Sequence, residues 1–107
     1  MNTEISIEKF LSWLCERERQ IVGLPGIWFN DPLSEWLTSI FGRLYGVRNR
    51  MYGPAQVDEC QWLWLPYWAV LFVLWTERYA FNREMSGADA VALLSEIEKR
   101  HTDFWVR

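Results

Sequence analysis

The arginines between residues 43 and 52 are the side chains of this sequence best suited to binding chemistry. No acidic residue occurs from Trp36 to Val57, so this segment is positive although the whole chain has a net charge of -3. Guanidinium groups bind carboxylates and phosphates in a bidentate way, and neighbouring tyrosine rings offer stacking surfaces. The candidate binding residues here are Arg43, Arg48, Arg50 and Tyr52, with Tyr45 between them. Two interpretations stay open: these arginines bind an acidic or phosphate-bearing partner, or they cap the preceding helix and pair with Asp58 or Glu59.

The histidine and cysteines of the chain do not form a pattern typical of catalysis or metal binding. His101 is the only imidazole, and the two cysteines, Cys15 and Cys60, are far apart in the sequence. Nucleophilic catalysis needs a base beside the nucleophile, so a Cys–His enzyme would require His101 to lie near one of these thiols in a cleft. The sequence contains neither a phosphate-binding glycine loop nor a zinc-ligand spacing. We therefore expect a non-enzymatic protein with no catalytic residues, no metal and no cofactor.

Tryptophan is the most over-represented residue type, with eight copies in 107 residues. One small core does not easily enclose that many indoles, and exposed tryptophans tend to mark interfaces. Trp28 and Phe29 lie in a segment rich in proline and glycine, and Trp105 is close to the C-terminal end of the sequence. These three side chains are predicted to be exposed docking residues, while a purely structural role for the aromatic excess remains the alternative.

The overall charge and the cysteine content point to a cytoplasmic protein. A sequence pI of about 5.1 argues against attraction of the whole molecule to nucleic acid or to an anionic membrane. Residues 1–9 contain Glu4 and Glu8 and do not resemble a secretion signal. Both cysteines have large apolar neighbours, so we expect two buried free thiols in a reducing compartment.

Capping residues and apolar spacing predict four helices. Ser6 caps the first, which runs toward Gly23, and Asp31 followed by Pro32 starts the second, which runs to Gly46. A third helix is expected from Pro66 to about Tyr79. Ser86 caps the fourth, whose apolar stripe continues to Phe104.

The uncharged segment 60–76 determines the expected architecture. It is apolar nearly all round from residue 68 to 75, so the third helix is predicted to be central and covered by the others. A membrane span is the alternative, but Pro66 interrupts the segment and acidic residues flank it, so no membrane association is expected. Residues 46–65 are expected to contribute at most one short strand or hairpin. The predicted fold is a mainly α bundle of about four helices, forming a single helical domain over residues 1–107.

Two segments resemble a pattern in small bacterial and mobile-element proteins. The first is Leu65-Pro66-Tyr67-Trp68-Ala69 with its apolar helix, and the second is the helix start at Ser86-Gly87-Ala88-Asp89-Ala90. The helix start at Asp31-Pro32-Leu33 is similar too. The resemblance implies no activity and no site residue.

The favoured function is a small interaction module, an adaptor or inhibitor of the kind made by phages and other mobile elements. It would dock on another protein, or on itself, through exposed tryptophans and the arginine patch. The predicted partner-binding residues are Trp28, Phe29, Trp105, Arg43, Arg48, Arg50 and Tyr52. The alternative is a nucleic-acid-binding accessory protein that uses the segment from Arg43 to Tyr52.

Overall fold

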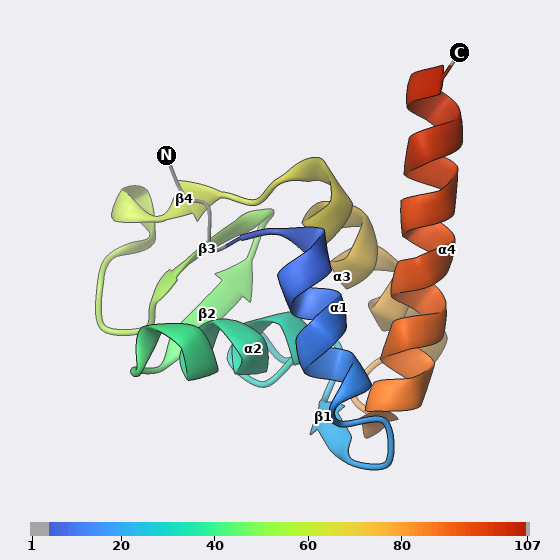
Figure 1. Cartoon of the computed structure of the whole chain (residues 1–107). Helices are drawn as coiled ribbons and strands as arrows, with labels where there is room; N and C mark the ends of the chain where they lie inside the picture. Colours follow the sequence, from blue (N-terminus) through green and yellow to red (C-terminus); the bar gives the residue numbers. More distant parts are fainter. Residues whose placement is uncertain (1–4, 107) are drawn as a thin grey trace.

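The structure, a computed structural model, describes the backbone of residues 5–106 and the side chains of residues 5–100. Its helices are α1 (Ile7–Cys15), α2 (Pro32–Phe41), α3 (Tyr67–Ala80) and α4 (Gly87–Val106), with a short 3-10 turn at Glu59–Gln61. Its strands are β1 (Ile21–Gly23), β2 (Tyr45–Arg48), β3 (Met51–Pro54), β4 (Leu63–Trp64) and β5 (Met85–Ser86). Figure 1 shows α4 along one side of the molecule and the β2–β3 hairpin on the other, with α1 and α3 between them.

The prediction of a mainly α bundle is wrong, because the protein is a mixed α and β fold with two antiparallel sheets. One sheet has three strands in the order β2-β3-β4, and the other pairs β1 with β5. The three-stranded sheet occupies the segment where at most one strand or hairpin was expected. Ile21 pairs with Ser86, which is far away in the sequence. A local sequence pattern cannot predict a pairing of this kind.

The helices start where their capping residues predicted. The Ser6 side chain accepts a hydrogen bond from the Lys9 N–H at 3.2 Å. The Asp31 carboxylate accepts one from the Ser34 N–H at 2.8 Å, and Pro32 occupies the first turn of α2. The Ser86 hydroxyl accepts one from the Asp89 N–H at 3.2 Å. At the starts of α1, α2 and α4 a side-chain oxygen satisfies an N–H that has no partner within the helix, whereas α3 follows Pro66 and has no side-chain cap.

The first two helices end earlier than their apolar spacing predicted. Helix α1 stops at Cys15, and Ile21 to Gly23 turn into β1, where Val22 is buried. Helix α2 stops at Phe41, because Gly42 has a left-handed φ of 75° and donates its N–H to the Thr38 carbonyl at 3.0 Å. Leu44 therefore lies outside the helix, even though it continues the spacing of the stripe.

Helix α3 is not the central element that its composition predicted. The core gathers around Phe10, whose ring lies 4.8 Å from Trp36, 5.9 Å from Trp68 and 5.0 Å from Phe72, measured between centroids. Only one face of α3 enters this core, and the opposite face leaves Tyr67 and Leu74 exposed. In the described part of the chain, no helix combines the length and apolar content required to cross a membrane.

Both cysteines are free and exposed, so the prediction of buried thiols is wrong. Cys15 is the last residue of α1 and lies off the buried stripe formed by Phe10 and Leu14. Cys60 lies in the 3-10 turn at Glu59–Gln61, which contains no buried residue. Apolar neighbours in the sequence do not determine whether a cysteine is buried. Burial depends on the direction in which the side chain points, and that direction is set by the position of the residue in the helical turn.

Candidate docking surface

The β2–β3 hairpin carries most of the predicted binding arginines. Arg48 ends β2, and Arg50 lies in the two-residue turn between Arg48 and Met51. Arg43 follows α2 and is exposed. Tyr52 lies on β3 and is only 4% exposed, so its ring belongs to the core and not to a binding surface. The side chains of Trp105 and His101 lie outside the described residues.

Trp28 is held in place by the sheet and by a second indole. Its ring centroid lies 6.1 Å from that of Trp62, and Phe29 packs edge-on against it at 4.9 Å. The two indoles lie on the cross-strand glycine pair Gly46 and Gly53. A Cβ atom at Gly46 would lie 2.5 Å from Trp28 Cε3, so Trp28 can pack on the sheet here only because Gly46 has no side chain. Trp28 is therefore half-buried and covers the sheet.

Arg48 is already engaged within the protein. Its Nη1 atom lies 3.2 Å from Glu59 Oε2, and its guanidinium lies over the Trp28 ring at 5.9 Å. The internal pairing with Glu59 was one of the two interpretations left open by the sequence. Both groups are partly exposed, so the pair contributes little to stability and serves mainly to orient Arg48.

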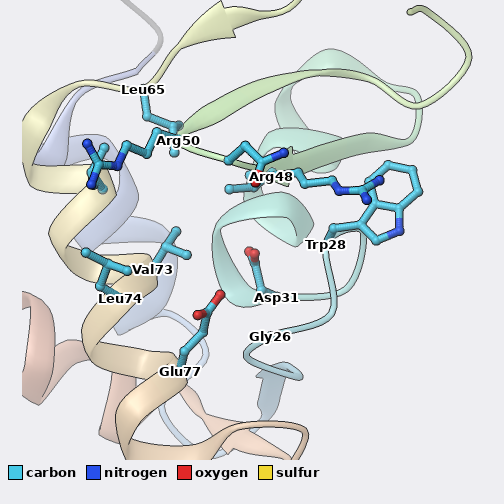
Figure 2. Close-up of a pocket in the computed structure, with 12 residues that line it drawn as sticks. Gly26, Trp28, Asp31, Arg48, Arg50, Leu65, Val73, Leu74 and Glu77 are labelled. Carbon is cyan, nitrogen blue, oxygen red and sulfur yellow. The ribbon is translucent and has the colours of Figure 1, made fainter. Parts of the chain in front are cut away.

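Arg50 differs from Arg48 in both backbone and side chain. Asn49 and Arg50 have φ values of 55° and 67°, the left-handed conformations of a type I′ turn. Glycine is preferred at the second of these positions, so an arginine there is conformationally costly. Its carbonyl accepts the Leu65 N–H at 2.9 Å, which ties the turn to the residues before α3. Figure 2 shows Arg50 extending toward α3, whereas Arg48 extends toward Trp28; the described residues offer the Arg50 guanidinium no ion-pair partner.

Arg50→Gly is expected to raise the free energy of unfolding by about 1 kcal/mol, because glycine adopts the left-handed turn without the Cβ penalty. Urea unfolding followed by circular dichroism measures the change. Arg43→Gly is the matched control, since Arg43 is exposed and does not have a positive φ; that substitution should lower stability. Equal or lower stability for Arg50→Gly would show that the turn is not under strain.

A continuous apolar surface, which we call the α3–β4 face, runs from β4 along the outer side of α3. Trp64 is 72% exposed and Tyr67 is 62% exposed, and both are far more accessible than the predicted anchor Trp28. A shallow hollow of about 490 Å³ lies on this face. Its lining consists of Arg50, Trp64, Leu65, Tyr67, Val70, Leu71 and Leu74. The face is therefore an apolar surface with one arginine at its rim.

A second hollow of about 450 Å³ adjoins the first, since Arg50, Leu65, Val70 and Leu74 line both. Figure 2 shows the Asp31 carboxylate and the Glu77 side chain both directed into this hollow, Asp31 from the start of α2 and Glu77 from α3. Burial raises the pKa of Asp31 to about 8, against the opposing effect of its backbone hydrogen bonds and with a smaller contribution from the charge of Glu77. Desolvation also raises the pKa of Glu77. Within the described residues neither carboxylate has a salt bridge to a basic side chain.

The sequence did not identify the α3–β4 face, although all of its apolar residues lie in the segment recognised as unusual. An almost uniformly apolar helix gives no polar side from which the outward direction can be read. One signal was present: Ala69, Thr76 and Ala80 are the smaller residues of α3, and all three are buried. The chain matches no protein-family model, no curated protein and no solved structure.

Proposed function

We propose that this protein is a small non-enzymatic interaction module that docks on a protein partner through the α3–β4 face. The observation that carries the proposal is the exposure of Trp64 beside Tyr67 and Leu74 on one hollowed surface. Single exposed apolar side chains are ordinary, but a contiguous group that includes two aromatic rings is typical of an interaction site. Tryptophan, tyrosine and arginine are also the residues that dominate binding energy at protein interfaces.

The α3–β4 face is better suited to docking than the residues first predicted. Trp28 and Arg48 already contact one another and the sheet, so a partner would have to displace these contacts. Burying a large apolar side chain that is exposed in the free protein contributes roughly 1.5–3 kcal/mol. Trp64 and Tyr67 together therefore supply the main anchors, and Arg50 supplies a charged group at the rim.

The nucleic-acid alternative gains no support from the geometry of its residues. Tyr52 is buried and offers no face for stacking on a base, and Arg48 is neutralised by Glu59. The remaining cations, Arg43 and Arg50, are too few for strong binding by counterion release. These residues therefore favour a protein partner over a nucleic acid.

A photo-crosslinking amino acid at position 64 is expected to give a covalent adduct when the full chain is irradiated in its native cells. Tyr79 is the matched control, because it is 51% exposed and belongs to α3 but lines a different hollow, beside Trp75 and Leu93. The adduct, detected by gel shift and mass spectrometry, should form from position 64 and not from position 79. No adduct from position 64, or equal yields from both positions, would overturn the proposed function.

A further inference from the structure

The hollow that Asp31 lines, which we call the Asp31 hollow, brings groups of both charges to one space. Its volume of about 450 Å³ lies within the range of small-molecule sites in proteins. Asp31 lines it from the start of α2, Glu77 from α3 and Arg50 from the β2–β3 turn. Figure 2 shows Arg50 at one end and Glu77 at the other, with Val73 and Leu74 of α3 between them. Three segments far apart in the sequence therefore converge here.

The wall of the Asp31 hollow between these charged groups is apolar. Val70, Val73 and Leu74 line it from α3, and Leu65 lines it from the segment before the helix. Small-molecule sites combine an apolar lining of this kind with a few polar groups that fix the orientation of the ligand. The wall is therefore suited to contact the apolar body of a ligand, and the charged groups are suited to contact its ends.

The carboxyl end of the Asp31 hollow lacks a cation of its own. Asp31 is 4% exposed, and its Oδ1 atom accepts the Ser34 N–H at 2.8 Å. Within the described residues neither Asp31 nor Glu77 has a salt bridge to a basic side chain. Arg78 follows Glu77 directly, but it lines a different hollow. Buried ionisable groups are normally paired, so a cationic group on a ligand would supply the partner that this end lacks.

The opposite end of the Asp31 hollow has a cation without an anion. Arg50 has no ion-pair partner among the described residues, whereas Arg48, which also lines the hollow, is paired with Glu59. A ligand with only a positive charge would meet Arg50, and a ligand with only a negative charge would meet two carboxyl groups. A ligand that carries both charges at separate positions gives each end a partner of opposite sign.

We infer that the Asp31 hollow binds a small zwitterion, a free apolar amino acid or a dipeptide, with its ammonium group between Asp31 and Glu77 and its carboxylate on Arg50. The apolar side chain of the ligand packs on the wall formed by α3. This inference goes beyond the proposed docking function and does not depend on it, because the hollow is a separate site beside the α3–β4 face.

Isothermal titration calorimetry of the purified full chain tests the inference with two probes, leucine and leucyl-leucine. At least one of them is expected to bind with a submillimolar dissociation constant. Matched probes each lack one charge: isoamylamine and isocaproate for leucine, and N-acetyl-leucyl-leucine and leucyl-leucine amide for the dipeptide. Each should bind about tenfold more weakly or worse, because one end of the hollow is left without its partner.

The two probes also distinguish the two sources of this chemistry. Saturation by leucine assigns the site to amino acids, and saturation by leucyl-leucine alone assigns it to dipeptides. No saturable binding of either probe at millimolar concentration would overturn the inference. Binding of a singly charged probe as tight as that of its zwitterion would overturn it too.

Ligand binding at neutral pH is expected to release a proton. Burial raises the pKa of Asp31 to about 8, so this carboxyl is protonated in the free protein. The charged groups around it are Glu35 of α2, Glu77 of α3 and the two arginines of the β2–β3 hairpin. A ligand ammonium favours the ionised carboxyl and lowers this pKa. Calorimetry in two buffers of different ionisation enthalpy measures the released proton, and no release would overturn the contact with Asp31.

Arg50→Gly is the sharpest test of the carboxylate end, because this substitution removes the guanidinium while it is expected to stabilise the chain. It should weaken binding about tenfold or more, and unfolding would not explain that loss. Asp31→Asn, which keeps a capping residue on α2, and Glu77→Gln should each have an effect of similar size. Arg43→Gln is the control, since Arg43 is exposed and does not line the hollow. Unchanged affinity in Arg50→Gly, or equal weakening by Arg43→Gln, would overturn the site.

Discussion

Raising the pH from about 4 to about 8 is expected to lower the free energy of unfolding, and Asp31→Asn should remove most of that loss. Asp31 is 4% exposed, and its burial raises the pKa from 3.8 to about 8. In this pH window the folded protein keeps the proton that the unfolded chain has released. The stabilisation is therefore complete below pH 4 and disappears as the pH rises toward 8.

The expected loss is on the order of 5 kcal/mol, since each pKa unit corresponds to about 1.4 kcal/mol. Asparagine lacks the titrating group but caps a helix as well as aspartate, so α2 should remain capped in the variant. Urea unfolding at a series of pH values gives the slope of the free energy of unfolding against pH, for the wild type and for Asp31→Asn. Glu77→Gln and Glu35→Gln are the comparison variants: desolvation raises the pKa of both carboxyls, so each should remove a smaller part of the slope. A slope as steep in Asp31→Asn as in the wild type would show that Asp31 is not its source.

Gly53→Ala is expected to destabilise the protein by about 3 kcal/mol through overpacking against Trp62. A Cβ atom at Gly53 would lie 2.5 Å from Trp62 Cγ and 2.8 Å from its Nε1. The indole cannot move aside easily, because its N–H donates to the Pro54 carbonyl at 3.1 Å and the Val57 carbonyl at 3.0 Å. Relief of the clash requires breaking these hydrogen bonds or separating Trp62 from Trp28.

Gly42→Ala distinguishes this clash from the general effect of replacing glycine. A Cβ atom there meets nothing within 4 Å, and the cost comes only from the positive φ of 75°. That cost should be about 1 kcal/mol. Thermal and urea unfolding give the two values, and near-UV circular dichroism should change only in Gly53→Ala. Similar losses in both variants would mean that Trp62 does not pack tightly on β3.

The helix starts could be predicted from sequence because each depends on residues three or four positions apart. Ser6, Asp31 and Ser86 act on N–H groups within the same turn, so their effect can be read locally. The sheets could not be predicted in this way. The β2–β3 turn is Asn49-Arg50, which lacks the glycine that usually marks a two-residue hairpin. The β1–β5 pairing depends on tertiary contacts, and β4 contains only two residues.

The sequence predicted which residue types the candidate surface would contain, but it predicted only part of the location of that surface. Exposed tryptophan beside arginine was expected, and Arg50 remains part of the proposed surface. The sequence placed the aromatic anchors at Trp28 and Phe29, because a loop rich in glycine and proline is usually exposed. Phe29 is exposed, at 36%, but Trp28 is half-buried, because Gly46 and Gly53 provide a flat area of sheet on which Trp28 and Trp62 pack. Trp64 was not among the predicted anchors, although its side chain is 72% exposed.

The brevity of β4 limits how this protein can aggregate. An added strand would need a row of free backbone groups along the sheet margin, yet this strand ends after Trp64 and Pro66 follows without an N–H. A strand from another molecule could form almost no backbone hydrogen bonds along β4. The apolar side chains beside this margin are thus exposed at an edge where strand addition is disfavoured.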